Sequence, residues 1–124
     1  MPGGTATRTK SGAPGQAAEP RAAGEPCCGL YHRAVELVGR RWTGAILLVL
    51  MDGPLRFSEV RERVPDLSDR LLSERMKELE REGIVERRVL EDVPVRVEYG
   101  LTAKGRALEP AVAALKRWAH EWHC

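Results

Sequence analysis

The 124-residue sequence predicts a mainly α-helical fold with a small β-hairpin, an α+β winged helix-turn-helix. Two observations between Arg56 and Thr102 lead to this prediction. A short helical segment, a tight turn and a longer amphipathic helical segment follow one another. The hydrophobic period then changes from helical to alternating, and two alternating segments flank an acidic tip that contains Pro94. A third observation, apolar residues at helical spacing on either side of this stretch, predicts helices at both ends of the domain.

Length and composition restrict the chain to one folded domain with a modest core. Residues 1–26 are rich in glycine and proline and have no large apolar side chain after Met1. We therefore expect a disordered tail, followed by the folded domain over residues 27–124. The longest apolar run, Ala45–Met51, is much shorter than the roughly 18 residues of a membrane span. Without a span or a signal peptide, the sequence predicts a cytoplasmic protein that does not associate with membranes.

Two helices are expected before the helix-turn-helix. The first covers Leu30–Val38, and Gly39 is its predicted stop signal. The second covers Trp42–Met51 and is nearly all apolar, as a buried helix would be. The turn residues Asp52–Pro54 end it.

The helix-turn-helix itself is predicted from its caps. Ser58 is the expected N-cap of a helix over Glu59–Val64, which Pro65 closes. Ser68 is the expected N-cap of the longer helix Asp69–Glu82. Alternation then predicts one strand from residue 85 to 89 and another from 95 to 101, with residues 91–94 as the tip of the wing.

The polar face of the longer helix is the candidate DNA-reading surface. On a helical wheel the leucines and Met76 gather on one side and are expected to pack on the preceding helices. The opposite side presents long cations and short hydrogen-bonding groups, as a helix in the major groove requires. Its candidate contacts are Arg70 for a base edge, Ser73 for a base or phosphate, Lys77 for phosphate, and Glu74, which either accepts from a cytosine amino group or pairs with Arg70.

The wing adds Arg87, Arg88 and Arg96 as candidates for backbone or minor-groove contacts. Strand alternation sends Arg87 and Arg88 to opposite faces, so at most two of the three arginines are expected to be used. Helix periodicity alone would equally suit any surface helix. The preceding helix, the turn and the two-stranded wing make DNA binding the better interpretation, with a protein-interaction module as the alternative.

Several motifs occur in a set order along the chain: Gly39–Trp42 (GRRW), Met51–Glu59 (MDGPLRFSE), Leu67–Arg87 (LSDRLLSERMKELEREGIVER), Pro94–Gly105 (PVRVEYGLTAKG) and the late Trp118. Together they resemble the HxlR family of bacterial winged-helix transcriptional regulators, and the resemblance spans residues 28–124. It implies a homodimeric DNA-binding regulator, usually a repressor, that acts on a palindromic operator.

The predicted last helix supports a dimer independently. Thr102 is its expected N-cap, and the helix runs over Ala103–Trp122 with a bend or break at Pro110. Packing on its own domain explains part of its apolar stripe, and a second subunit explains more, because a domain this small cannot bury two tryptophans from one helix. Two-fold pairing would also set two recognition helices one DNA turn apart. The stripe consists of Leu108, Val112, Leu115, Trp118 and Trp122.

The cysteines lie at the two ends of the expected fold. The family resemblance extends to Cys28, and some members use a cysteine there to sense quinones, aldehydes or oxidants. A helix N-terminus favours the thiolate, so modification of Cys28 is expected to move the first helix and alter DNA affinity. Cys27 and Cys124 are candidate resolving thiols, Cys124 from the other subunit if the two ends meet there. The alternative is a regulator without thiol sensing, either constitutive or controlled by a metal or ligand.

Two further interpretations, a metal site and an enzyme, are less favoured. Cys27, Cys28 and His32 with His120, His123 and Cys124 form a loose set of thiophilic metal ligands, but their spacing is irregular and no metal or other cofactor is predicted. The sequence has no phosphate loop and no nucleophile elbow, and an enzyme is therefore not expected.

Overall fold

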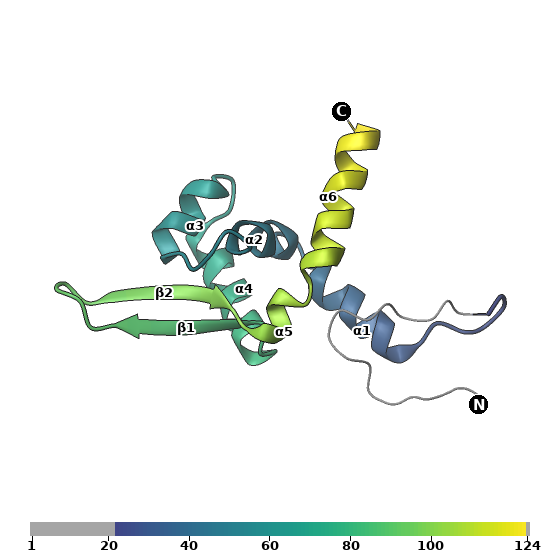
Figure 1. Ribbon diagram of the computed structural model, residues 1–124, viewed down its shortest axis with the longest axis horizontal. Coiled ribbons are helices and arrows are strands. Elements are labelled where there is room, and N and C mark those ends of the chain that lie inside the picture. The colour runs from purple at the N-terminus through teal and green to yellow at the C-terminus, as the bar shows by residue number, and fades with distance from the viewer. Residues whose placement is uncertain (1–21, 124) are drawn as a thin grey trace.

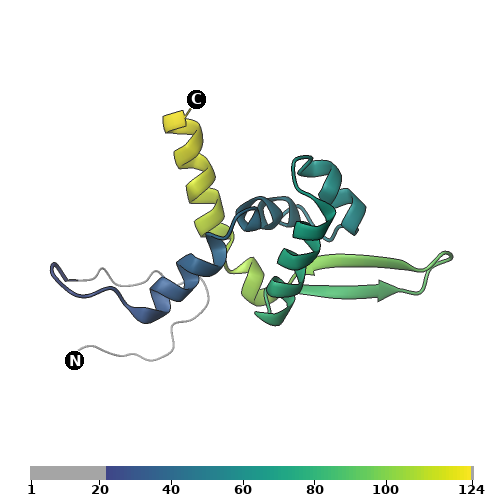
Figure 2. The same ribbon diagram turned by 180° about the vertical axis from the view of Figure 1, so that it is seen from behind.

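The computed structural model describes residues 22–123, so most of the predicted tail and Cys124 lie outside the described residues. The helix-turn-helix and the hairpin form one end of the molecule, and the first and last helices extend from the other end (Figure 1). The reverse view shows the same separation (Figure 2). No helix among the described residues is long and apolar enough to cross a membrane.

The first two helices, α1 (Gly29–Val38) and α2 (Thr43–Leu50), differ sharply in burial. None of the residues of α1 is buried, whereas α2 places Ile46, Leu47 and Leu50 in the core. As predicted, α1 ends at Gly39, whose backbone N–H donates to the Val35 carbonyl at 2.8 Å.

Helix α2 starts one residue later than predicted, because Trp42 precedes it in a left-handed conformation with φ of 75°. This conformation costs a residue with a Cβ atom about 1–2 kcal/mol. The partly buried Trp42 side chain packs against the core and helps to offset that cost.

The predicted cap of α3 (Phe57–Arg63) is wrong. Ser58 lies inside the first turn, and the N-cap is Arg56, two residues earlier than predicted. The Glu59 carboxylate makes the capping contact by accepting the Arg56 backbone N–H at 2.7 Å. This hydrogen bond is the main reason that the pKa of Glu59 lies below its usual value of 4.5, so any stabilisation from it is lost as the pH falls through the lowered pKa.

The second helix of the motif, α4 (Asp69–Arg81), starts as predicted. The Ser68 hydroxyl accepts the Leu71 N–H at 3.1 Å and caps the helix. Leu72, Met76 and Leu79 are buried, which confirms the apolar face that the sequence predicts.

Strands β1 (Val85–Leu90) and β2 (Arg96–Leu101) form an antiparallel pair. The register places Val85 opposite Leu101 and Val89 opposite Val97, so these four apolar residues share one face of the hairpin. Leu55 extends this sheet through an isolated bridge to Tyr99, with reciprocal backbone hydrogen bonds of 2.9 and 2.8 Å. The short bridge ties the start of the helix-turn-helix to the wing.

The predicted last helix is interrupted, as Pro110 suggests. A four-residue helix α5 (Ala103–Arg106) is followed by α6 (Glu109–His123). The Thr102 hydroxyl caps α5 by accepting the Gly105 N–H at 3.1 Å. Pro110 lies in the first turn of α6, where its missing N–H removes no intrahelical hydrogen bond.

The core lies between α2, α3, α4 and β1 rather than under α1 or α6. Its buried apolar residues are Ile46, Leu47, Leu50, Leu55, Val60, Val64, Leu67, Leu72, Met76, Leu79, Ile84 and Val85. It therefore fixes the helix-turn-helix and leaves the two terminal helices covering only its edge.

Candidate nucleic-acid interface

The exposed face of α4 carries the predicted reading residues. Arg70 lies in the first turn with its side chain 89% exposed, and its Nε is 3.3 Å from a Glu74 carboxylate oxygen. Lys77 is exposed two turns further along, whereas Ser73 is half-buried. The exposed cations among the predicted contacts of this face are therefore Arg70 and Lys77. The Arg70 guanidinium is oriented by its neighbour on the helix.

The start of α4 is attached to α3. The Arg61 guanidinium forms an ion pair with the Asp69 carboxylate in the first turn of α4. Together with the Ser68 cap, this contact fixes the end of α4 that carries Arg70. Arg61 and Asp69 are eight residues apart, so helical periodicity does not predict their contact.

The three wing arginines differ in their surroundings. Arg96 lies 3.1 Å from an Asp92 carboxylate oxygen and 3.8 Å from one of Glu98, so two acids partly neutralise it. The Arg88 guanidinium lies over Gly100, on the opposite face of the hairpin from Arg87. The alternation predicted for Arg87 and Arg88 is confirmed, and an approaching phosphate could meet only one of them from a given side.

A second set of charged residues, which helical patterning did not single out, lies on the flank of α4. Arg75 Nε donates to the Arg41 carbonyl at 2.9 Å. Arg40 Nη1 lies 3.1 Å from a Glu78 carboxylate oxygen. Both contacts connect α4 to the loop between α1 and α2. The sequence motif GRRW includes this loop. The spacing of residues along the chain, however, does not predict that the loop contacts α4.

Cys28 is exposed and is the N-cap residue of α1, as predicted from its place before the first helix. Cys27 is also exposed, and its sulfur lies 3.5 Å from the Cys28 carbonyl oxygen. The His32 ring lies 3.5 Å from the Glu36 carboxylate, one turn along α1. Within residues 22–123, no three His, Cys, Asp or Glu side chains come together as a metal site.

The terminal helices leave large apolar side chains in contact with solvent. Val112 on α6 and Leu108, just before the helix, are partly buried against the core. The outer part of the same predicted stripe is open, and its neighbour α1 is similarly uncovered. The exposed residues are Leu115, Trp118 and Trp122 on α6 and Leu30, Tyr31 and Val35 on α1.

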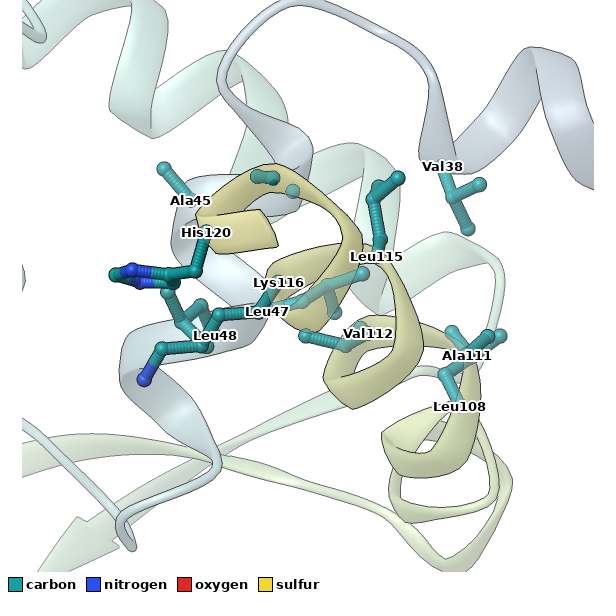
Figure 3. Close-up of a pocket in the computed structure, with 12 residues that line it drawn as sticks. Val38, Ala45, Leu47, Leu48, Leu108, Ala111, Val112, Leu115, Lys116 and His120 are labelled. Atoms are coloured by element: carbon teal, nitrogen blue, oxygen red, sulfur yellow. The ribbon is translucent and has the colours of Figure 1, made fainter. Parts of the chain in front are cut away.

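An apolar groove of about 360 Å³ separates α2 from α6. Leu47 and Leu48 line it from α2, Val112 and Leu115 line it from α6, and Leu108 lines it just before α6 (Figure 3). The groove and the exposed α6 stripe share Leu115. They therefore form one continuous apolar surface on the side of the molecule away from the wing.

Sequence comparison identifies the family. The model of the HxlR-like helix-turn-helix family matches residues 37–124. The HTH-type transcriptional regulator YvaP of Bacillus subtilis (strain 168) is 47% identical over 95 residues, which cover 77% of this chain and 88% of YvaP. YodB of the same organism is 46% identical over 99 residues, which cover 80% of this chain and 88% of YodB.

Solved structures agree with this assignment. The reduced form of YodB from B. subtilis superposes with a TM-score of 0.71 at 46% identity, covering 78% of this chain and 95% of YodB. YodB has also been solved diamide-treated and quinone-bound, with TM-scores of 0.68 and 0.67. The oxidised form of the redox regulator HypR gives 0.71 at 38% identity, covering 74% of this chain and 95% of HypR.

The capped α4 with its exposed cations, the hairpin wing and these matches lead to one assignment. The fold is a winged helix-turn-helix, and the family consists of transcriptional regulators rather than enzymes. The chain belongs to the HxlR-like helix-turn-helix family and is a DNA-binding transcriptional regulator.

Proposed function

We propose that this regulator binds a palindromic operator as a homodimer, represses transcription there, and is released when the Cys28 thiol is oxidised or alkylated. The exposed polar face of α4 carries the DNA-reading part of the proposal. Arg70 is 89% exposed on a helix whose other face is buried, which is the arrangement that a major groove requires. In this proposal Arg70 contacts a base edge, Ser73 a base or phosphate, and Lys77 a phosphate, while Glu74 orients Arg70.

The wing contributes one backbone contact at each half-site. Arg88 and Arg87 are the candidates, because Arg96 is already shared between two carboxylates. A cation without such partners gains more from a phosphate, since it does not have to give up an existing ion pair.

The homodimer is supported by the apolar surface of the terminal helices. Trp118 and Trp122 are 52% and 67% exposed in one copy of the chain, which is unusual for such large apolar side chains on an isolated domain. A two-fold axis next to α1 and α6 would cover them and leave both α4 helices free on the far side. Paired α4 helices would then read the two halves of a palindrome.

A dimerisation variant tests this part. Leu115→Glu places a charge at an exposed position of the stripe, so it should leave the folded monomer intact and weaken the dimer at least tenfold, since a buried charge without a partner is costly. Sedimentation velocity over a concentration series measures the dimer dissociation constant. Val95→Glu is the matched control, because Val95 is 64% exposed and Leu115 67%, but Val95 lies in the wing, directly before β2. Equal dimerisation of both variants would place the interface elsewhere.

Thiol control is supported by the position and exposure of Cys28 and by the relatives. YodB has been solved in reduced, diamide-treated and quinone-bound forms, and HypR is a redox regulator. A quinone-type electrophile would form an S–C bond with the Cys28 thiolate as its C=C π bond breaks, and the resulting enolate would take up a proton from water. An oxidant would take two electrons and two protons as Cys28 forms a disulfide with Cys27 or with Cys124 of the partner subunit.

The test begins with an operator obtained by selection from a random-sequence duplex pool with reduced protein. Diamide should then weaken binding of the parent to this operator at least tenfold, about 1.4 kcal/mol, as read by gel shift and footprinting. Cys28→Ser should remain bound under diamide, because it cannot form the disulfide. A Cys28→Ser protein that dissociates like the parent would refute thiol control. Failure to select any preferred sequence would instead favour a protein-interaction module.

A further inference from the structure

The loop between α1 and α2 is attached directly to the recognition helix. Arg75 Nε donates to the Arg41 carbonyl at 2.9 Å, and Arg40 Nη1 lies 3.1 Å from Glu78 Oε2. Arg75 and Glu78 are three residues apart and therefore lie on the same flank of α4, between its buried and its exposed faces. These residues hold α4 from the side and leave its exposed polar face free for DNA.

The loop is short and conformationally restricted. Only residues 40–42 follow the Gly39 cap of α1 before α2 begins at Thr43. Trp42 is held in the left-handed conformation and packs against the core, and the Arg41 guanidinium lies 5.3 Å from the centre of its ring. Because this loop has little conformational freedom, a displacement at one of its ends also displaces the other end.

Helix α1 depends on this loop for its position. It has no buried residue, and only Leu37 and Val38 near its end pack partly against the core. Cys28 lies at its other end. The contacts to α4 are therefore a substantial part of what sets the direction of α1 relative to the helix-turn-helix.

The attachment of the loop to α4 depends on the pairing of Glu78 with Arg40. Its side chain is 18% exposed, and its Oε1 atom is buried without a hydrogen-bond partner in the described part of the chain. Arg40 therefore supplies the charge that compensates this carboxylate. A half-buried carboxylate that loses its cation is strongly unfavourable, so the loop and α4 tend to move together rather than separate.

We propose that Arg40, Arg75 and Glu78 are positioning residues that couple α1 to the recognition helix, so that a displacement of α1 reorients α4. The proposal rests on the proposed thiol control for its natural trigger, which is modification of Cys28. It adds the route by which that modification changes DNA affinity.

The Arg75–Arg41 and Arg40–Glu78 contacts together are called the link. The test compares how much alkylation of Cys28 changes DNA affinity in proteins with and without this link. Cys27 and Cys124 are first replaced by serine, so that Cys28 is the one remaining thiol of the chain. Arg75→Met with Glu78→Met removes both contacts while keeping similar side-chain volumes, because methionine replaces neither the guanidinium donor nor the carboxylate acceptor. Iodoacetamide then alkylates Cys28, and the operator dissociation constant is measured before and after alkylation. The ratio of the two values is the readout, which a change in stability alone would not alter.

With the link intact, alkylation should raise the dissociation constant at least about tenfold. Without the link, the unmodified protein should bind within about threefold of the parent, and alkylation should change binding by less than about threefold. Arg63→Met is the matched control, since it breaks the 3.0 Å ion pair with Asp52, outside the link, and should keep the full response. The exchange Arg40→Glu with Glu78→Arg should restore part of the response relative to Arg40→Glu alone. An unlinked protein that responds as strongly as the parent would overturn the proposal and leave thiol control standing.

If alkylation does not change DNA binding by the parent, thiol control is refuted. A second perturbation of α1, which needs no thiol, then tests the link. Leu37→Ala removes part of the packing of α1 on the core and needs no thiol. It should weaken operator binding about fivefold with the link intact and less than twofold without it, as a double-mutant cycle measures. Equal losses in both backgrounds would overturn the link.

Discussion

Replacing Arg70 with alanine is expected to weaken binding to the selected operator by about 1–3 kcal/mol and to relax the base preference at one position of each half-site. The physical reason is the place of Arg70 in the first turn of α4, where an exposed guanidinium can reach a base edge with two parallel hydrogen bonds. The Glu74 carboxylate at 3.3 Å orients the guanidinium before DNA arrives and so reduces the ordering cost of binding.

Lys77→Ala is the matched comparison on the same face of the same helix. Its ammonium is expected to meet phosphate, so the variant should bind all sequences more weakly and show a salt dependence that is shallower by about one charge. Titrations against the operator and a scrambled duplex at several salt concentrations separate the two effects. If Arg70→Ala lost affinity equally for both duplexes, Arg70 would be a phosphate contact rather than a reader of sequence.

Gly105→Ala is expected to destabilise the fold by about 3 kcal/mol or more. A Cβ atom at this buried position would lie 2.2 Å from the Ile84 carbonyl oxygen, a backbone atom that cannot rotate away. The Thr102 N–H donates to that same oxygen at 3.0 Å, so the clash would separate α5 from the start of β1. For a domain of this size, the melting temperature should fall by at least about 12 °C.

Gly44→Ala is the control for that substitution. Gly44 lies in the first turn of α2, and a Cβ atom there would meet nothing within 4 Å. Alanine also restricts the unfolded chain, so we expect no loss, or a gain of up to about 1 kcal/mol. Denaturant unfolding of both variants measures the difference. Similar stabilities for the two variants would mean that α5 can shift on the strand without cost.

The elements that the sequence predicts well are those with local determinants. Ser68 and Thr102 cap the helices that they were expected to cap, because an N-cap hydroxyl needs only a backbone N–H two or three residues away. Ser58 was predicted by the same rule and is wrong. The Glu59 carboxylate accepts the Arg56 backbone N–H instead, and α3 therefore starts earlier than predicted. Ser58 and Glu59 both carry acceptors near this helix start, and residue type alone does not decide which of them makes the capping contact.

The candidate site also has some features that local sequence patterns predict and others that they do not. The exposed face of α4 follows from helical periodicity, and the separation of Arg87 from Arg88 follows from strand alternation. The partners of the wing arginines are harder to predict. The two carboxylates near Arg96 and the position of Arg88 over Gly100 depend on the register of the hairpin and on side-chain rotamers.

By itself, the sequence determined the order of the helices and strands, the polar face of α4, the break near Pro110 and the place of Cys28 before the first helix. These features depend on backbone preferences and periodicities that act within a few residues. Only the tertiary structure decided that Arg75 and Glu78 hold the loop of Arg40 and Arg41, more than thirty residues earlier in the chain. Contacts between residues so far apart form when the core brings two helices together, and local patterns of charge and polarity carry no information about that distance.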